Sequence, residues 1–210
     1  MGVGERLSNP RQIVKYQTNK YLLEVIDHLQ IADPENASHI HNKYSRLKIN
    51  ALDYSQGTGE KTVFANANID AVTAKYIAEI VLSSPSGNPS KAKVYSEQKI
   101  LSHALNDNGL AKVTIFTIMY DSGRNYCWQI TVENGSGKPQ KQPSGGIAVE
   151  KGSYKKGNQI QVYMNDIDCK KYFLTVRDYV LAWETVHLRS LLQDRARYEE
   201  QNNTRVPVNN

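Results

Sequence analysis

Apolar residues recur every three or four positions over the first long segment of the chain, from Pro10 to Ile31. This spacing places them on one face of a helix. Ser8 or Asn9 can cap the helix, and Pro10 suits its first turn because no intrahelical hydrogen bond is lost there. The sequence therefore predicts an N-terminal helix. Its apolar face contains Ile13, Val14, Tyr21, Leu22, Val25, Ile26 and Leu29.

The pattern then changes to the period of two that strands show. Residues 45–54 alternate between apolar and polar side chains, and 62–66 return after the turn 56–60, which predicts a hairpin. A middle helix is expected to begin at Asp70, a residue type that caps helices well. The stretch 83–90, rich in serine, proline and glycine, is predicted to be a linker. The inward positions of the middle helix are Ala74, Ile77, Ile80 and Val81.

Strand signals dominate the centre of the chain. Residues 112–120 are apolar on both faces and rich in branched side chains, as in a central strand. Residues 126–132 alternate cleanly, which predicts a neighbouring strand with one face more buried than the other. The preceding residues 97–105 fit a short helix as well as they fit a strand.

The last third of the chain begins with a segment rich in glycine, proline and lysine, 134–146, which we expect to be a mobile loop. Residues 146–151 and 159–164 predict one more hairpin. A long C-terminal helix should run from Asp166 to about Arg197, because apolar residues recur there at helical spacing. Residues 198–210 are expected to form a disordered polar tail.

Together these elements predict the α+β class, with curved antiparallel sheets of hairpins, an N-terminal helix, a middle helix and a long C-terminal helix. Residues 1–197 are expected to form one domain, with 1–84 and 91–197 as candidate halves. VFANANID (63–70) and VYMNDID (162–168) each end a strand and start a helix, which suggests a pseudo-two-fold repeat of strand–strand–helix units. The alternative is that Asn and Asp recur there only because they cap helices well.

Composition narrows the class of protein and of partner. The 210 residues include 26 Lys and Arg against 21 Asp and Glu, a formal net charge of +5. This excess favours anionic partners such as nucleic acid. The start of the chain has no signal-peptide core, and no apolar run is long enough to cross a bilayer, so we expect a cytoplasmic protein without membrane contact. Cys127 and Cys169 form no CxxC pair and are expected to be reduced and partly buried.

Sequence patterns of catalysis and cofactor binding are missing. Gly57 and Gly59 lie in a predicted hairpin, and the chain contains no Gly-Lys-Ser or Gly-Lys-Thr, so the familiar nucleotide-binding loops are excluded. His39 and His41 could share a metal only with further ligands, and surface loop residues are the plainer interpretation. We therefore expect no catalytic residue, no metal and no cofactor, and an enzyme that uses the two histidines is the third hypothesis.

Aromatic and basic residues gather in the predicted hairpins. The chain has 13 Tyr against 3 Phe, and tyrosine offers a flat ring for base stacking. Segment 134–160 carries five lysines against one acid, a charge of +4 that suits a phosphate backbone. Ordinary packing and a solvated loop are the alternatives. The candidate nucleic-acid-binding residues are Arg46, Lys48, Tyr54, Lys61, Lys138, Lys141, Lys151, Tyr154, Lys155 and Lys156.

The stretch from Val113 to Trp183 resembles the single-stranded DNA-binding fold of the Whirly and positive-cofactor-four group. The resemblance covers about a third of the chain and rests on the strand pair VTIFTIMY and YCWQITV, the loop NGSGKPQKQPSGG that runs into GGIAV, and the helix CKKYFLTVRDYVLAW. The group passes from its Gly–Ile strand directly to the helix, whereas EKGSYKKGNQIQVY intervenes here. The resemblance implies curved antiparallel strands, sequence-tolerant binding of single strands, and oligomerisation through the helices.

We therefore predict a homo-oligomeric, sequence-tolerant binding protein for single-stranded DNA or RNA, of the kind that a mobile element, phage or plasmid encodes. The main alternative is a structural or assembly protein that acts through protein–protein contacts of its sheet and C-terminal helix. In that case Leu188, Leu191 and Leu192 would pack on a second subunit.

Overall fold

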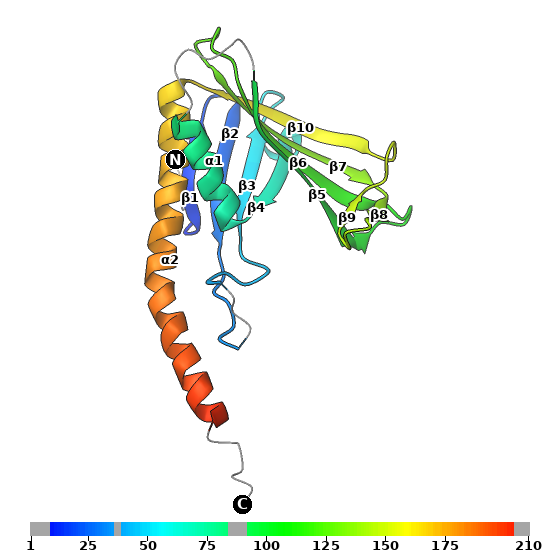
Figure 1. The fold of residues 1–210 in the computed structure, drawn as a ribbon. Helices are drawn as coiled ribbons and strands as arrows, with labels where there is room; N and C mark the ends of the chain where they lie inside the picture. The colour runs from blue at the N-terminus through cyan, green and yellow to red at the C-terminus, as the bar shows by residue number, and fades with distance from the viewer. Residues whose placement is uncertain (1–8, 36–38, 84–91, 204–210) are drawn as a thin grey trace, which may run out of the picture.

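The computed structural model describes residues 9–35, 39–83 and 92–203. Within these ranges the chain forms ten strands, a short 3-10 turn and two α-helices. Eight of the strands form two antiparallel four-stranded sheets, and the other two pair with each other. The two large sheets splay apart, and the long C-terminal helix runs along the first sheet and continues well past it (Figure 1). The class is α+β with antiparallel sheets and a long C-terminal helix, as predicted.

The first sheet comes from the N-terminal part of the described chain. The turn η1 (Gly59–Lys61) precedes its last strand, and helix α1 (Ala71–Ser83) follows that strand. Asp70 caps α1 as predicted, because its carboxylate accepts a hydrogen bond from the backbone N–H of Thr73 at 2.7 Å. Each strand pairs with the next in chain order: β1 (Gln12–Gln17), β2 (Tyr21–His28), β3 (Arg46–Asp53) and β4 (Val63–Ile69).

The second sheet also consists of four antiparallel strands followed by a helix, α2 (Asp166–Asn203). Helix α2 includes residues 198–203, where the sequence predicts the start of the polar tail. Residues 97–105 belong to strand β5, so the strand is the correct one of the two alternatives predicted there. From one edge to the other the sheet contains β10 (Lys155–Met164), β7 (Trp128–Gly137), β6 (Ala111–Tyr120) and β5 (Ala92–Leu105). A small hairpin lies between β7 and β10 in the chain, formed by β8 (Pro139–Lys141) and β9 (Ile147–Val149).

The predicted N-terminal helix is wrong, because residues 10–31 contain the hairpin β1–β2. Thr18 directs the reversal: its hydroxyl oxygen accepts hydrogen bonds from the backbone N–H groups of Lys20 and Tyr21, at 3.3 and 3.0 Å. A threonine that bonds to the backbone just after it favours a turn over a helix. Branched and aromatic residues flank this turn and suit strands, and β2 pairs with β3 along its whole length.

The hairpin predicted between 146–151 and 159–164 is also wrong. Strand β9 pairs with β8, and β10 pairs with β7. Burial explains the choice, because Ile160, Val162 and Met164 of β10 are at most 1% exposed against the core and could not be buried in an isolated hairpin. The segment EKGSYKKGNQIQVY thus contains most of the fourth strand, which is followed at once by α2. Of the predicted linker, residues 83–90, Ser83 is the last residue of α1, and the rest lies outside the described residues.

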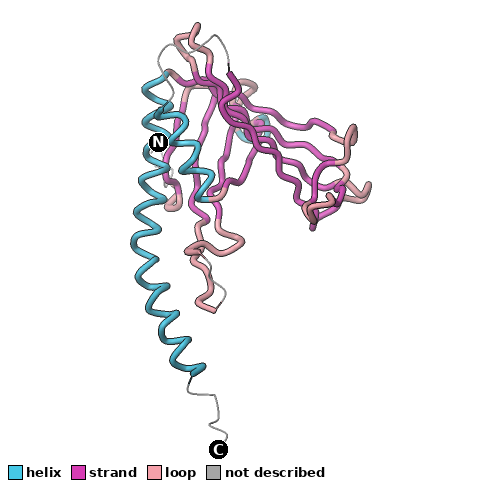
Figure 2. The backbone as a smooth tube through the Cα atoms, in the orientation of Figure 1, coloured by secondary structure: helices cyan, strands magenta, loops and turns pink. Residues whose placement is uncertain are grey.

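Helices α1 and α2 lie side by side against one face of the first sheet (Figure 2). Small side chains allow this close approach: Ala51, Ala65 and Ala67 of the sheet and Ala74 and Ala78 of α1 are all at most 2% exposed. The same buried cluster continues onto the inner face of the second sheet. One hydrophobic core therefore holds both sheets and both helices together.

The outer edge of β4 is joined to the second sheet by side chains. The backbone N–H of Asn66 donates to the amide oxygen of Asn134 at 2.9 Å, and the Asn134 amide donates back to the Asn66 carbonyl at 2.6 Å. Lys99 donates to the Asn68 carbonyl at 3.0 Å. An edge strand needs partners for its free backbone groups, and here they fix the position of the second sheet beside the first.

Candidate nucleic-acid interface

The face of the first sheet opposite the helices mixes polar and apolar side chains, and its charges are mostly basic, with Lys15, Arg46 and Lys48 against Glu24. Strand residues alternate between the two faces, so the inward positions of β3, such as Leu47 and Ile49, leave Arg46 and Lys48 on the other side. We call this outer side the basic face. It carries Lys15 and Gln17 from β1, Leu22, Glu24, Ile26 and His28 from β2, Arg46, Lys48, Asn50 and Leu52 from β3, and Phe64, Asn66 and Asn68 from β4.

Cations from distant parts of the chain meet around His28 on this face. The pKa of His28 lies below its usual value, and burial of the ring is the largest cause. Nearby positive charges lower it further and outweigh the opposing charge of Asp27; they belong to Arg11, Lys48 and Arg46. A depressed histidine pKa is the expected response to a local positive potential. The basic face can therefore attract an anion.

An exposed aromatic ring lies among these charges. Phe64 is 40% exposed, and the ammonium group of Lys48 lies 5.9 Å from the centroid of its ring. Phe64 also lines a shallow depression of about 590 Å³ with Tyr54, which follows β3. Two rings beside a row of cations can stack on bases while the cations neutralise phosphates.

The second sheet adds cations to the same side. Lys155, Ser136 and Lys112 are cross-strand neighbours in β10, β7 and β6, so their side chains share one face. The Lys112 ammonium donates a hydrogen bond to the amide oxygen of Asn66 at 2.9 Å. Lys112 thus reaches the basic face, and Lys155 points to the same side of the second sheet.

Tyr154 and its neighbouring lysines do not share one surface. Lys156 is paired with Gly135, on the face opposite Lys155, and lies 3.4 Å from the carboxylate of Glu133. The hydroxyl of Tyr154 donates to the same carboxylate at 2.5 Å. Burial, followed by this hydrogen bond, raises the pKa of Tyr154. Its ring packs against Gly135, where an added Cβ would lie 2.7 Å from the ring, so Tyr154 is a packing residue.

The other predicted residues lie at two further places. Lys138, Lys141 and Lys151 are exposed in and around the β8–β9 hairpin, at the far end of the second sheet (Figure 1). Lys61 is exposed at the end of η1, before β4. Of the ten candidates, the basic face brings together Arg46, Lys48 and Tyr54, and Lys155 points to the same side.

Sequence reasoning missed the part of the basic face that comes from β1 and β2. The sequence predicts a helix over residues 10–31, which hides the alternation of Lys15 and His28 with inward residues. The signal was present, because Glu24, Ile26 and His28 are spaced two apart, as residues on one face of a strand must be.

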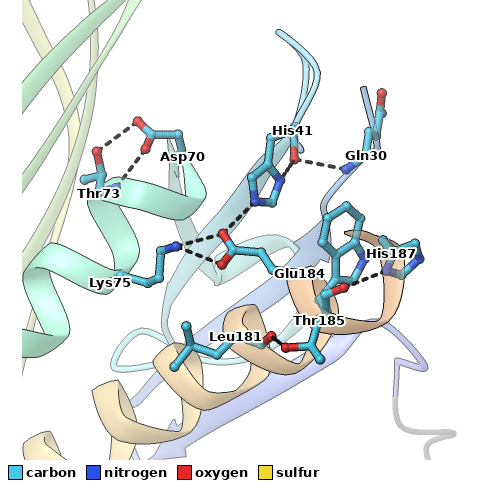
Figure 3. A network of polar contacts seen from close by, with 11 residues as sticks. Gln30, His41, Asp70, Thr73, Lys75, Leu181, Glu184, Thr185 and His187 are labelled. Atoms are coloured by element: carbon cyan, nitrogen blue, oxygen red, sulfur yellow. Dashed lines mark hydrogen bonds and ion pairs between the residues drawn. The ribbon is translucent and has the colours of Figure 1, made fainter. Parts of the chain in front are cut away.

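A second polar cluster connects the loop before β3 to both helices (Figure 3). His41 lies 2.9 Å from the Ser45 hydroxyl through Nδ1 and 2.9 Å from the Glu184 carboxylate through Nε2. Lys75 of α1 donates to both carboxylate oxygens of Glu184 at 2.8 Å. Burial by itself would raise the pKa of Glu184, but the hydrogen bonds from Lys75 and His41 outweigh burial and lower it.

The polar groups of this cluster are bonded to one another and to the backbone nearby. The Ser45 hydroxyl oxygen accepts a hydrogen bond from the backbone N–H of Gln30 at 3.0 Å, and the ring of His41 stacks on Trp183 at 5.0 Å between centroids. Both ring nitrogens of His41 have partners, whereas His39 is exposed nearby. The arrangement fixes the loop to α1 and α2. Among the described residues, no three His, Cys, Asp or Glu side chains gather so that they could hold a metal ion.

No protein-family model matches the chain, and no curated protein matches its sequence. In the described ranges, neither helix combines the length and the apolar composition that a membrane span needs.

Proposed function

We propose that the chain binds single-stranded nucleic acid, DNA or RNA, through the basic face of the first sheet. The observation that carries this proposal is the convergence of Arg11, Arg46 and Lys48 on His28. Arg11 precedes β1, and Arg46 and Lys48 belong to β3, so the cations come from the two strands on either side of His28 in β2. A surface built in this way matches a polyanion better than it matches a neutral partner, because each cation can neutralise a phosphate.

Single strands suit this face better than duplexes do. Phe64 and Tyr54 offer ring faces to unpaired bases, and stacking of this kind accepts every base. Asn50, Asn66 and Asn68 lie in the same region and provide amide groups, which can donate to or accept from base edges. Binding is expected to be sequence-tolerant, because phosphate contacts and stacking dominate it.

Each half has a four-stranded antiparallel sheet followed by a helix, and the second half adds the β8–β9 hairpin before its last strand. Apart from this insertion, the shared order fits the proposed resemblance to the Whirly group and a two-fold repeat of the halves. In this proposal the protein acts by binding and carries out no catalysis. Its buried cysteines, Cys127 and Cys169, are both free, which suits a cytoplasmic protein, and we retain an origin in a mobile element, phage or plasmid.

A second candidate function, assembly with other protein chains, is favoured by the surface of α2. Leu181, Leu188 and Leu192 are all more than two-fifths exposed. Leu181 and Leu188 line a pocket with α1 and the loop before β3, and Leu188 and Leu192 line a second hollow formed by α2 alone. Exposed apolar patches of this kind commonly mark protein interfaces. Leu191, in contrast, is 1% exposed inside its own chain. The two functions are compatible, because a homo-oligomer formed through α2 would leave the basic face open.

Fluorescence anisotropy with labelled single-stranded and double-stranded DNA tests the first function. The measurement is made at two salt concentrations. We expect the single strand to bind more tightly, and the affinity to fall steeply with salt because lysines and arginines release counterions. Equal binding of a duplex, or affinity that does not respond to salt, would contradict the proposal. A fixed oligomer that ignores added oligonucleotide would favour assembly alone.

A further inference from the structure

Four tyrosines surround one depression at the junction of the two sheets. Tyr16 and Tyr21 come from the β1–β2 hairpin, Tyr126 precedes β7, and Tyr163 belongs to β10. The depression has a volume of about 380 Å³. Ligand pockets in proteins begin at about this size, roughly 300 Å³. Packing at the sheet junction does not account for all four rings, because Tyr126 and Tyr163 stay exposed.

The two rings from the second sheet remain accessible. Tyr126 is 56% exposed and Tyr163 is 36% exposed, whereas Val162 beneath them is 1% exposed. The Tyr163 hydroxyl donates to the amide oxygen of Gln161 at 3.3 Å. The depression therefore has a buried apolar residue, Val162, next to accessible aromatic rings, and a flat heterocycle can stack in such an environment.

The depression is continuous with the proposed binding surface. It is lined by Thr18 and Asn19 of the β1–β2 turn, and both residues also line the depression that contains Tyr54 and Phe64. The two hollows thus lie on either side of one short turn. Lys20 of the same turn lines the tyrosine depression and supplies a cation for the phosphate that must cross there.

We propose that the depression of Tyr16, Tyr21, Tyr126 and Tyr163 is a base-binding site, which takes one unpaired nucleobase from a strand that runs off the basic face across the β1–β2 turn. This inference rests on the proposed function and gives a reason why the protein would prefer single strands to duplexes. A base enters such a site only when it is neither paired nor stacked in a duplex, so the depression makes the protein choose single strands. Lys20, the cation that lines the depression, favours a phosphate-bearing ligand over a neutral sugar, which would also stack on tyrosine.

The test compares oligothymidylate with an abasic oligonucleotide of equal length, which keeps the phosphates and lacks the bases. The variants are Tyr126→Ala with Tyr163→Ala, the ring-retaining Tyr126→Phe with Tyr163→Phe, and the control Tyr76→Ala, an exposed tyrosine of α1 (58%). We expect the alanine pair to weaken oligothymidylate binding about 5- to 150-fold per base held, with little change for the abasic probe. The phenylalanine pair and the control should bind like the unaltered protein.

The outcomes separate this inference from the proposed function. Unchanged oligothymidylate affinity in the alanine pair, together with a loss in Arg46 and Lys48 variants, overturns the base site and leaves the basic face standing. The reverse result keeps the base site and overturns the basic face. No binding of either probe by the unaltered protein overturns both. Tyrosine-dependent binding of a neutral oligosaccharide without oligonucleotide binding reassigns the depression to a sugar. Circular dichroism melting confirms that each variant is folded.

Discussion

Replacing Arg46 and Lys48 with alanine removes two of six cations on or beside the basic face. The six are Arg11, Lys15, Arg46, Lys48, Lys112 and Lys155. For single strands, the logarithm of the binding constant falls with the logarithm of salt concentration by about 0.7 for each phosphate neutralised. Six contacts therefore give a slope of about −4, and four contacts give about −3. Between about 50 and 200 mM salt, the unaltered protein should lose roughly 300-fold in affinity and the double variant roughly 50-fold.

Anisotropy titrations of a labelled oligothymidylate across a salt series measure this slope directly. The matched control is Lys141→Ala with Lys151→Ala, because it removes the same charge from exposed lysines around the β8–β9 hairpin. We expect the control to keep the slope of the unaltered protein. An equal reduction of the slope in both double variants would refute the reasoning, because it would mean that overall charge matters and the basic face does not.

Three further predictions concern single residues. Because His28 has a depressed pKa and a bound phosphate would raise it, oligonucleotide affinity should increase as pH falls from about 7.5 to 5.5; a His28→Gln variant that keeps this pH dependence contradicts the assignment. Glu184→Gln should lower the free energy of unfolding by about 1–3 kcal/mol, measured by urea denaturation at neutral pH. Because folding lowers the pKa of Glu184, this difference in the free energy of unfolding is fully present at pH values above the usual pKa of a glutamate. It should shrink as pH falls through the lower pKa of the folded state, and a constant difference at acid pH would argue against the ion pair. Gly135→Ala should destabilise the protein by about 1–3 kcal/mol, seen as a lower melting temperature, because its Cβ would lie 2.5 Å from the Lys155 carbonyl oxygen; an unchanged melting temperature would show that β10 can move aside.

Period-two patterns in the sequence predicted strands reliably where the two faces differ in polarity. Residues 45–54 are an example. Residues 112–120 are apolar on both faces, and their branched side chains predicted the strand instead. Residues 10–31 misled the prediction, because apolar residues on both sides of the β1–β2 turn mimic helical spacing. Only the pairing of β2 with β3 and the hydroxyl of Thr18 decide in favour of strands, and neither is visible in local periodicity.

The candidate site was predictable only in part for a related reason. Alternation within β3 was enough to place Arg46 and Lys48 on one face. Lys155 and Lys156 are adjacent in β10, so alternation puts them on opposite faces, whereas the sequence prediction placed both between two strands. Which neighbours Lys112 and Lys155 meet depends on the pairing of β6, β7 and β10. Tyr154 looked like a free ring because its partner, Glu133, is 21 positions away in the sequence.

A nuclear magnetic resonance titration of the isotope-labelled protein with oligothymidylate tests the central claim most directly, because it locates the strand on the molecule. We predict that the largest shifts of backbone amides fall in β3 and β4, around Lys48, Phe64 and Asn66, and in the β1–β2 turn. Shifts confined to α2 or to the β8–β9 hairpin, or no shifts at all, would contradict a nucleic-acid interface on the first sheet.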